Sequence, residues 1–110
     1  MFTPELKKGS IEMLVLSLLE ARARHGYEIG KLIESRSGGR LTFALPTLYP
    51  TLLRLENRGW IKGRWVEKPG ERERCFYRLT AGGRRVLADQ RRIWQAYVAA
   101  VNDVLGVDRA

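Results

Sequence analysis

The sequence predicts a mainly α-helical protein with one small β-hairpin, in the order helix, helix, helix, strand, strand, helix. Three observations predict this fold class. Apolar residues recur at helical spacing in three segments before residue 59, an arginine-rich stretch alternates around a Pro-Gly turn, and residues 81–110 keep a helical period over several turns. The 110 residues have room for one domain and not for a second core.

The first two helices are predicted from apolar spacing and from their ends. Ser10 is the expected N-cap of a helix over residues 11–23, which is apolar over so much of its girth that it is either central in the core or shared with a partner. The second helix begins near Gly26 and ends at residues 37–39, where two glycines follow a serine. Residues 40–43 are β-prone and predict a minor strand that pairs with the later hairpin.

The third helix contains two prolines near its start. Proline lacks an N–H and is tolerated only before the helical hydrogen-bond ladder begins, so a start at Pro46 or Thr47 places Pro50 in the first turn or at its edge. Leucines at positions 48, 52 and 55 lie on one side, with Leu53 near it, and are expected to face the core. The opposite face is polar and basic, and Gly59 ends the helix.

A hairpin follows directly. Residues 61, 63 and 65 alternate on the first strand, residues 75, 77 and 79 on the second, and residues 68–71 form a turn with proline and glycine at the positions that type II favours. Many lysines and arginines decorate this hairpin. They either form a basic wing that contacts an anionic partner or protect an exposed sheet edge against aggregation.

The last helix begins after Thr80, the expected N-cap, and exposes more apolar surface than so small a core can cover. The surface predicted to meet a second copy of the chain combines two residues of the first helix with six of the last helix. They are Leu14, Leu18, Ile93, Trp94, Tyr97, Val98, Val101 and Leu105. The alternative is a monomer in which this helix folds back on the first one.

Charge is concentrated in the middle of the chain. The net charge is +8, and residues 54–92 carry 12 basic and 5 acidic side chains. Such clustering around one helix and one hairpin favours a nucleic-acid partner. No apolar run is long enough to cross a membrane, and a single cysteine and a single histidine fifty residues apart provide neither a zinc site nor a catalytic pair. We therefore expect a cytoplasmic protein that is not an enzyme and has no metal and no cofactor.

Three helices followed by a basic hairpin describe a winged helix-turn-helix, in which the third helix enters the major groove of double-stranded DNA. The residues expected to contact DNA from that helix are Thr47, Tyr49, Pro50, Thr51 and Arg54, and those expected from the wing are Lys68, Arg72 and Arg74. A winged-helix adaptor that binds a protein and not DNA is the alternative.

The chain resembles the PadR family of transcriptional regulators from about residue 6 to residue 105. The resemblance rests on the segment His-Gly-Tyr-Glu-Ile at 25–29, on Leu-Tyr-Pro at 48–50 with its continuation to Gly59, and on Tyr-Arg-Leu-Thr at 77–80 with Gly83. It implies a dimeric repressor with a winged helix-turn-helix over residues 1–80 and a dimerisation helix over residues 81–110. Leu45-Pro46 replaces the small polar residues often found at this point in the family, so operator preference stays open.

The resemblance also raises the hypothesis of an effector. In some relatives a tryptophan of the last helix meets its twin across the dimer and stacks a flat aromatic ligand, and Trp94, with Tyr97 beside it, occupies the similar place. The alternative is plain packing, which is the commoner role of an aromatic residue on an apolar stripe.

Overall fold

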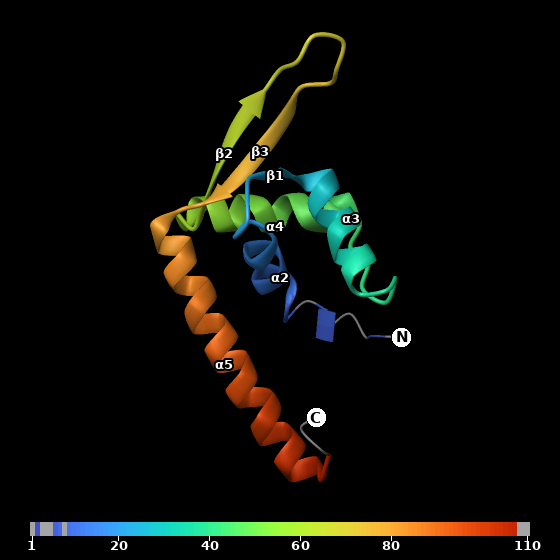
Figure 1. Cartoon of the computed structure of the whole chain (residues 1–110), viewed down its shortest axis with the longest axis vertical. Helices are drawn as coiled ribbons and strands as arrows, with labels where there is room; N and C mark the ends of the chain where they lie inside the picture. The colour runs from blue at the N-terminus through green and yellow to red at the C-terminus, as the bar shows by residue number, and fades with distance from the viewer. Residues whose placement is uncertain (1, 3–5, 8, 108–110) are drawn as a thin grey trace.

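The computed structural model describes residues 2, 6, 7 and 9–107. Its helices are α2 (Ile11–Leu18), α3 (Gly26–Arg36), α4 (Leu45–Asn57) and α5 (Ala81–Leu105), and its strands are β1 (Arg24–His25), β2 (Ile61–Val66) and β3 (Arg74–Leu79) (Figure 1). The predicted fold class is confirmed: the described chain is mainly helical with a small antiparallel sheet, and the two long strands form a hairpin that projects from the helices.

The sheet contains a strand that sequence reasoning placed elsewhere. The order is β1-β3-β2, and β1 pairs with β3 through Arg24 opposite Tyr77 and His25 opposite Phe76. The prediction of a strand at residues 40–43 is wrong: these residues form no strand, and the third strand of the sheet is β1, which pairs with β3.

The first helix is shorter than predicted, ending at Leu18 instead of reaching residue 23. Arg24 is buried where the chain returns, and its Nε donates to the Leu18 carbonyl oxygen at 2.7 Å. A carbonyl at a helix C-terminus has no partner within the helix, so this contact stabilises both the early end of α2 and the placement of β1.

The core lies where α2, α3 and α4 meet beneath the sheet. Its fully or nearly fully buried apolar side chains are Ile11, Val15, Leu16, Leu18, Leu19, Ile29, Ile33, Leu48, Leu52, Leu55, Ile61, Leu79 and Leu87. One residue of each long strand and one of α5 belong to this set, so the wing and the last helix are both anchored on the helical body. The body therefore fixes how α4 and the hairpin lie relative to each other.

The two predicted chain reversals are confirmed. Gly59 has φ +77°, a left-handed conformation that favours glycine, and it turns the chain from α4 into β2. At the tip of the wing, the N–H of Glu71 donates to the Lys68 carbonyl oxygen at 3.0 Å, and Gly70 has φ +75° as a type II turn requires.

The last helix begins at the expected cap and then leaves the body. Thr80 Oγ1 accepts a hydrogen bond from the N–H of Gly83 at 3.0 Å, and Leu87 is buried. The C-terminal part of the helix extends as an arm away from the wing (Figure 1), and the 25 residues of the helix correspond to a length of about 37 Å. Among the described residues, no helix combines the length and the apolarity needed to span a membrane.

Candidate nucleic-acid interface

The helix α4 begins one or two residues earlier than predicted. Ala44 is its N-cap, and the carbonyl oxygen of Ala44 accepts from the N–H groups of Thr47 and Leu48. Pro50 therefore lies inside the helix, beyond its first turn. Pro50 has no N–H to donate to the carbonyl oxygen of Pro46. Because Pro46 is exposed, water can bond this carbonyl, and the lost helical hydrogen bond costs less than it would in a buried helix.

One face of α4 is free of the body and carries most of the predicted contacts. Thr47, Tyr49, Pro50 and Arg54 are all exposed on it. Thr51 is not: its side chain is only 1% exposed, and its hydroxyl donates to the Thr47 carbonyl oxygen at 3.1 Å. The prediction that Thr51 contacts DNA is thus wrong, because the residue is buried and its hydroxyl is already hydrogen-bonded to Thr47 and Arg54 of the same helix.

Two further residues belong to the free face and were missed. Leu53 was expected near the core, but 58% of its surface is exposed, and Asn57 is exposed one turn further along. Both follow Tyr49 and Pro50 at helical spacing, so the solvent-facing ridge is Pro46, Tyr49, Pro50, Leu53, Arg54 and Asn57. This ridge offers a phenol, an amide, a guanidinium and an apolar side chain, which together can contact base edges and thymine methyl groups.

Tyr49 lies where α4 meets the start of α3 and the wing. A Cβ added at Gly26 would lie 2.9 Å from Tyr49 Cε1, so the glycine leaves room for the Tyr49 ring in its observed position. A cleft of about 450 Å³ separates this corner from the wing, and Tyr49, Trp65, Tyr77 and Arg72 are among the residues that line it. Burial raises the pKa of Tyr77, and a hydrogen bond with Cys75 adds to that shift.

Arg54 is held on the body side of the ridge. Its Nη2 donates to Thr51 Oγ1 at 3.0 Å, and its Nε lies 3.5 Å from Glu12 Oε2 of α2. Glu12 Oε1 is also 2.8 Å from Nη1 of Arg58, one turn further along α4. A single carboxylate therefore pairs with two arginines of this helix.

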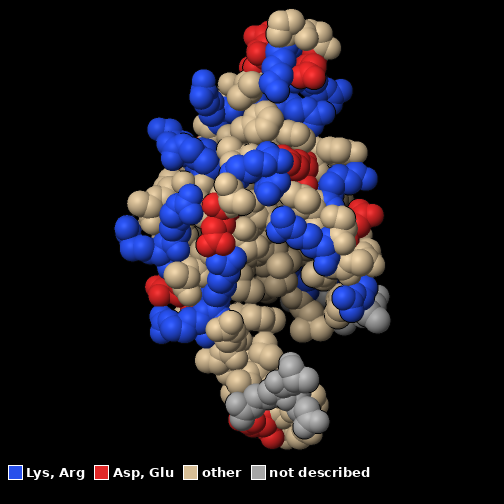
Figure 2. Space-filling model, in the orientation of Figure 1, with Lys and Arg blue, Asp and Glu red and all other residues tan. Residues whose placement is uncertain are grey.

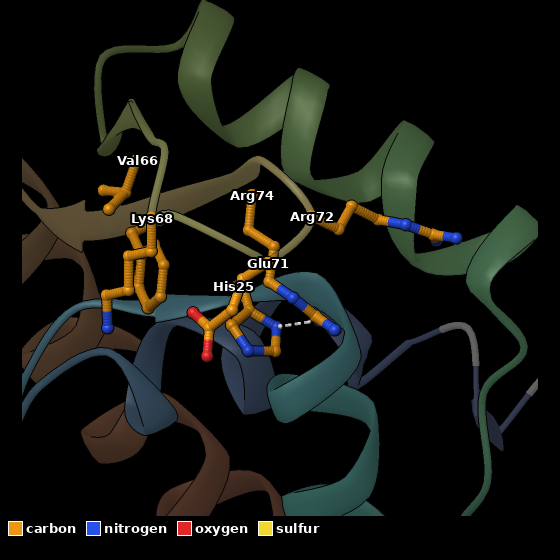
Figure 3. Close-up of a pocket in the computed structure, with 7 residues that line it drawn as sticks. His25, Val66, Lys68, Glu71, Arg72 and Arg74 are labelled. Atoms are coloured by element: carbon orange, nitrogen blue, oxygen red, sulfur yellow. Dashed lines mark hydrogen bonds between the residues drawn. The ribbon is translucent and has the colours of Figure 1, made fainter.

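The wing carries the second group of cations. Lys68, Arg72 and Arg74 are exposed as predicted, and together with Glu71 they line a hollow of about 380 Å³ between the wing and β1 (Figure 3). Lysine and arginine side chains gather over the wing and the body on the face shown in Figure 2, whereas few lie on the far part of α5. Such a distribution of charge fits a polyanion that follows the wing and α4.

His25 connects the wing to α3. Its Nδ1 accepts from the N–H of Glu28 at 3.2 Å and caps α3, and Arg74 Nη1 lies 3.3 Å from the same nitrogen (Figure 3). Partial burial and the nearby charge of Arg74 lower the pKa of His25 below its ordinary value near 6.5, Glu28 opposing the shift and Arg22 adding to it. The neutral ring is the form that can accept the capping hydrogen bond.

The predicted partner-facing residues of α5 divide into two sets. Ile93, Trp94, Tyr97 and Leu105 are exposed, with at least 46% of each surface accessible, while Val98 and Val101 are partly covered. Leu14 of α2 is partly buried against the core. The prediction of Leu18 in this surface is wrong, since it is packed in the core at 5% exposure.

A hollow of about 350 Å³ lies between α2 and the exposed part of α5. It is lined by Gly9, Glu12, Met13, Gln90, Ile93, Trp94 and Tyr97. The rings of Trp94 and Tyr97 are 6.4 Å apart, and Gln90 Oε1 is buried with no hydrogen-bond partner in the described structure. Within the described part of the chain, no group of three or more His, Cys, Asp or Glu side chains is placed to hold a metal ion.

The arrangement of three helices, a basic hairpin and a free helical ridge defines a winged helix-turn-helix protein. Residues 15–89 match the model of the PadR-like family of transcriptional regulators, and the chain belongs to that family.

Solved structures support the same assignment. A transcriptional regulator from Clostridium thermocellum is 27% identical, with a TM-score of 0.86 over 94% of this chain and 97% of that one. A PadR family regulator from Eggerthella lenta is 32% identical, with a TM-score of 0.83 over 94% and 88%. Bacillus subtilis PadR, solved in complex with operator DNA, is 26% identical with a TM-score of 0.67, over 73% of this chain and 46% of its own.

Proposed function

We propose that this transcriptional regulator is a repressor that binds a palindromic operator as a homodimer, with α4 in the major groove. The observation that carries the proposal is the ridge of α4, which is exposed although it includes a leucine and a tyrosine, and which lies beside a wing rich in arginine. A ridge of this composition supports base reading, and the wing cations support contacts to the adjacent backbone or minor groove.

The proposed dimer uses the arm of α5, so that residues 1–80 form the DNA-binding part and residues 81–110 the dimerisation part. Ile93, Tyr97 and Leu105 are each more than 60% exposed on the same helix, which is a large apolar surface for a small monomer to leave in water. Two-fold pairing along this arm would cover it and would present two α4 helices to one duplex. Half-sites about 34 Å apart are the geometric requirement.

Salt dependence separates this function from the adaptor alternative. If the protein neutralises phosphates, the logarithm of its affinity for DNA falls steeply and linearly with the logarithm of the salt concentration. A protein-binding adaptor shows no DNA complex that weakens in this way. We expect the regulator to lose roughly 500-fold or more in affinity for DNA between 50 and 200 mM salt if about five or more phosphates are contacted. A complex unaffected by salt would favour the adaptor.

We further propose that the hollow between α2 and α5 binds a flat aromatic effector that releases the operator. Trp94 and Tyr97 offer aromatic faces, and the unpartnered Gln90 Oε1 can accept a hydrogen bond from such a ligand. Titration with planar drugs and phenolic compounds should quench tryptophan fluorescence in the wild type and not in Trp94→Ala. Absence of quenching by all of them would count against the effector and leave DNA binding untouched. We also propose that the regulator acts in the cytoplasm.

A further inference from the structure

One carboxylate of α2 contacts two arginines of α4 from outside that helix. Glu12 Oε1 pairs with Arg58 at 2.8 Å and Glu12 Oε2 with Arg54 at 3.5 Å, although the partners are 46 and 42 positions away in the chain. Glu12 is itself largely covered, with 27% of its side chain accessible, whereas each arginine side chain is about half accessible. The carboxylate therefore pairs both with Arg54 of the ridge and with Arg58, which follows one turn later on α4 and is not part of the ridge.

This placement restrains how Arg54 can act. The donation from Arg54 to Thr51 and the pairing with Glu12 hold the guanidinium at two points on the same side. An arginine that is held in this way reaches DNA with its remaining N–H groups in a fixed direction, which suits bidentate contact with one base. A free arginine would instead reach the closest phosphate, which adds affinity for every sequence alike.

The same carboxylate also lines the hollow that contains Trp94 and Tyr97. Of the described residues that line this hollow, Glu12 alone carries a charge. A change in the hollow that draws Glu12 toward it would act directly on Arg54 and Arg58, without passing through the wing. Glu12 thus both lines the hollow beside α5 and pairs with two arginines of α4.

We propose that Glu12 is a positioning residue that determines the sequence specificity of this regulator. It holds Arg54 and Arg58 away from non-specific phosphate contacts. The inference rests on the proposed DNA-binding function and adds a residue that lies outside the DNA-facing ridge.

The test compares two duplexes on full-length protein. One is an operator recovered by selection from a random pool, and the other is a scrambled duplex of the same composition. In Glu12→Gln, the affinity for the scrambled duplex should rise about three- to tenfold, and its salt slope should steepen by about one or two, since one or two more phosphates are neutralised. The ratio of scrambled to operator dissociation constants should fall roughly tenfold, because base contact by Arg54 is no longer enforced.

Glu20→Gln is the matched control. It removes the same charge and breaks the pairing of Glu20 with Arg91, which lies at 2.9 Å, but it does not touch α4. It should change both affinities by one common factor and leave their ratio unchanged. If Glu12→Gln behaves like Glu20→Gln, the inference is overturned and Glu12 is an ordinary ion-pair partner.

Glu12→Asp covers the case in which the glutamine variant does not fold. It keeps the net charge and shortens the side chain by one methylene, so it should lower the ratio of dissociation constants with little change in the salt slope. An unchanged ratio in this variant overturns the inference as well. If the wild type itself selects no duplex from the pool, the proposed function fails, which is a different result from an unchanged ratio.

Discussion

Replacing Gly83 with alanine tests how α5 is attached to the body. A Cβ added at this position would lie 1.9 Å from the Trp60 carbonyl oxygen and 2.9 Å from the carbonyl carbon. Such a carbon and oxygen do not approach within 3.0 Å in real structures, so the two elements must separate by at least about 1 Å. The obstacle is a backbone carbonyl and not a flexible side chain. The same carbonyl oxygen accepts the N–H of Thr80 at 3.1 Å, which restrains its position further.

The expected cost is large for one methyl group. Overpacking that shifts backbone typically costs about 1–3 kcal/mol, and we expect the upper part of that range, about 2–3 kcal/mol. For a domain of this size the unfolding midpoint should fall by roughly 10–20 °C. Thermal unfolding followed by circular dichroism measures it, with all variants at one protein concentration because a dimer's midpoint depends on concentration.

Gly82→Ala is the matched control at the neighbouring position. A Cβ there meets its nearest atom at 3.7 Å, which is ordinary contact, and replacing a helical glycine stabilises by up to about 1 kcal/mol. The two alanine variants should therefore shift the midpoint in opposite directions, or Gly82→Ala should leave it unchanged. Equal stability of both variants would refute the seating of α5 on the Trp60 carbonyl.

Three other predictions concern the ridge, the wing and the arm. Replacing thymidine by deoxyuridine at the operator position that Leu53 contacts should weaken wild-type binding about fourfold and leave Leu53→Ala insensitive, because only a methyl group is lost; equal sensitivity in both proteins would exclude this contact. The pKa of His25 is lower in the folded state than in the unfolded state, so as pH falls the unfolded state takes up the proton first. The free energy of unfolding that neutral His25 contributes is therefore full above about pH 6.5 and declines as pH falls below that value. His25→Asn keeps a capping side chain without this titration, so the wild type should lose stability relative to it between pH 7.5 and 5.5 in urea unfolding; parallel curves would contradict the assignment. Trp94→Ala should raise the dimer dissociation constant at least about 30-fold in sedimentation equilibrium, and an unchanged association state would place the dimer surface elsewhere.

The sequence predicted the helices and the hairpin well because their signals are local. Apolar spacing placed α3, α4 and α5. The two alternating sets predicted for the hairpin pair with each other, with Gly63 opposite Tyr77 and Trp65 opposite Cys75. The strand β1 was missed because two residues carry no period of their own, and its partner lies some fifty positions away.

The exposed face of α4 was located from the sequence, but only some of its residues were. Leu53 and Thr51 were assigned to the wrong sides because a leucine-rich helix shows one broad apolar stripe, whose edge depends on where α2 crosses it. Thr51 is buried, whereas Leu53 is exposed. Glu12 could not be found at all, since the pairing of a residue of α2 with Arg54 and Arg58 depends on packing between helices and leaves no spacing pattern in the chain.

The most direct test of the DNA-binding role is a selection experiment, in which the full-length protein recovers the duplexes it binds from a random pool. We predict enrichment of a palindrome whose half-sites have centres about 10 base pairs apart, or a multiple of that turn, as two copies of α4 on one face of the duplex require. Recovery of a single asymmetric site, or of no enriched sequence at low salt, would contradict a dimeric regulator that reads its operator through the ridge of α4.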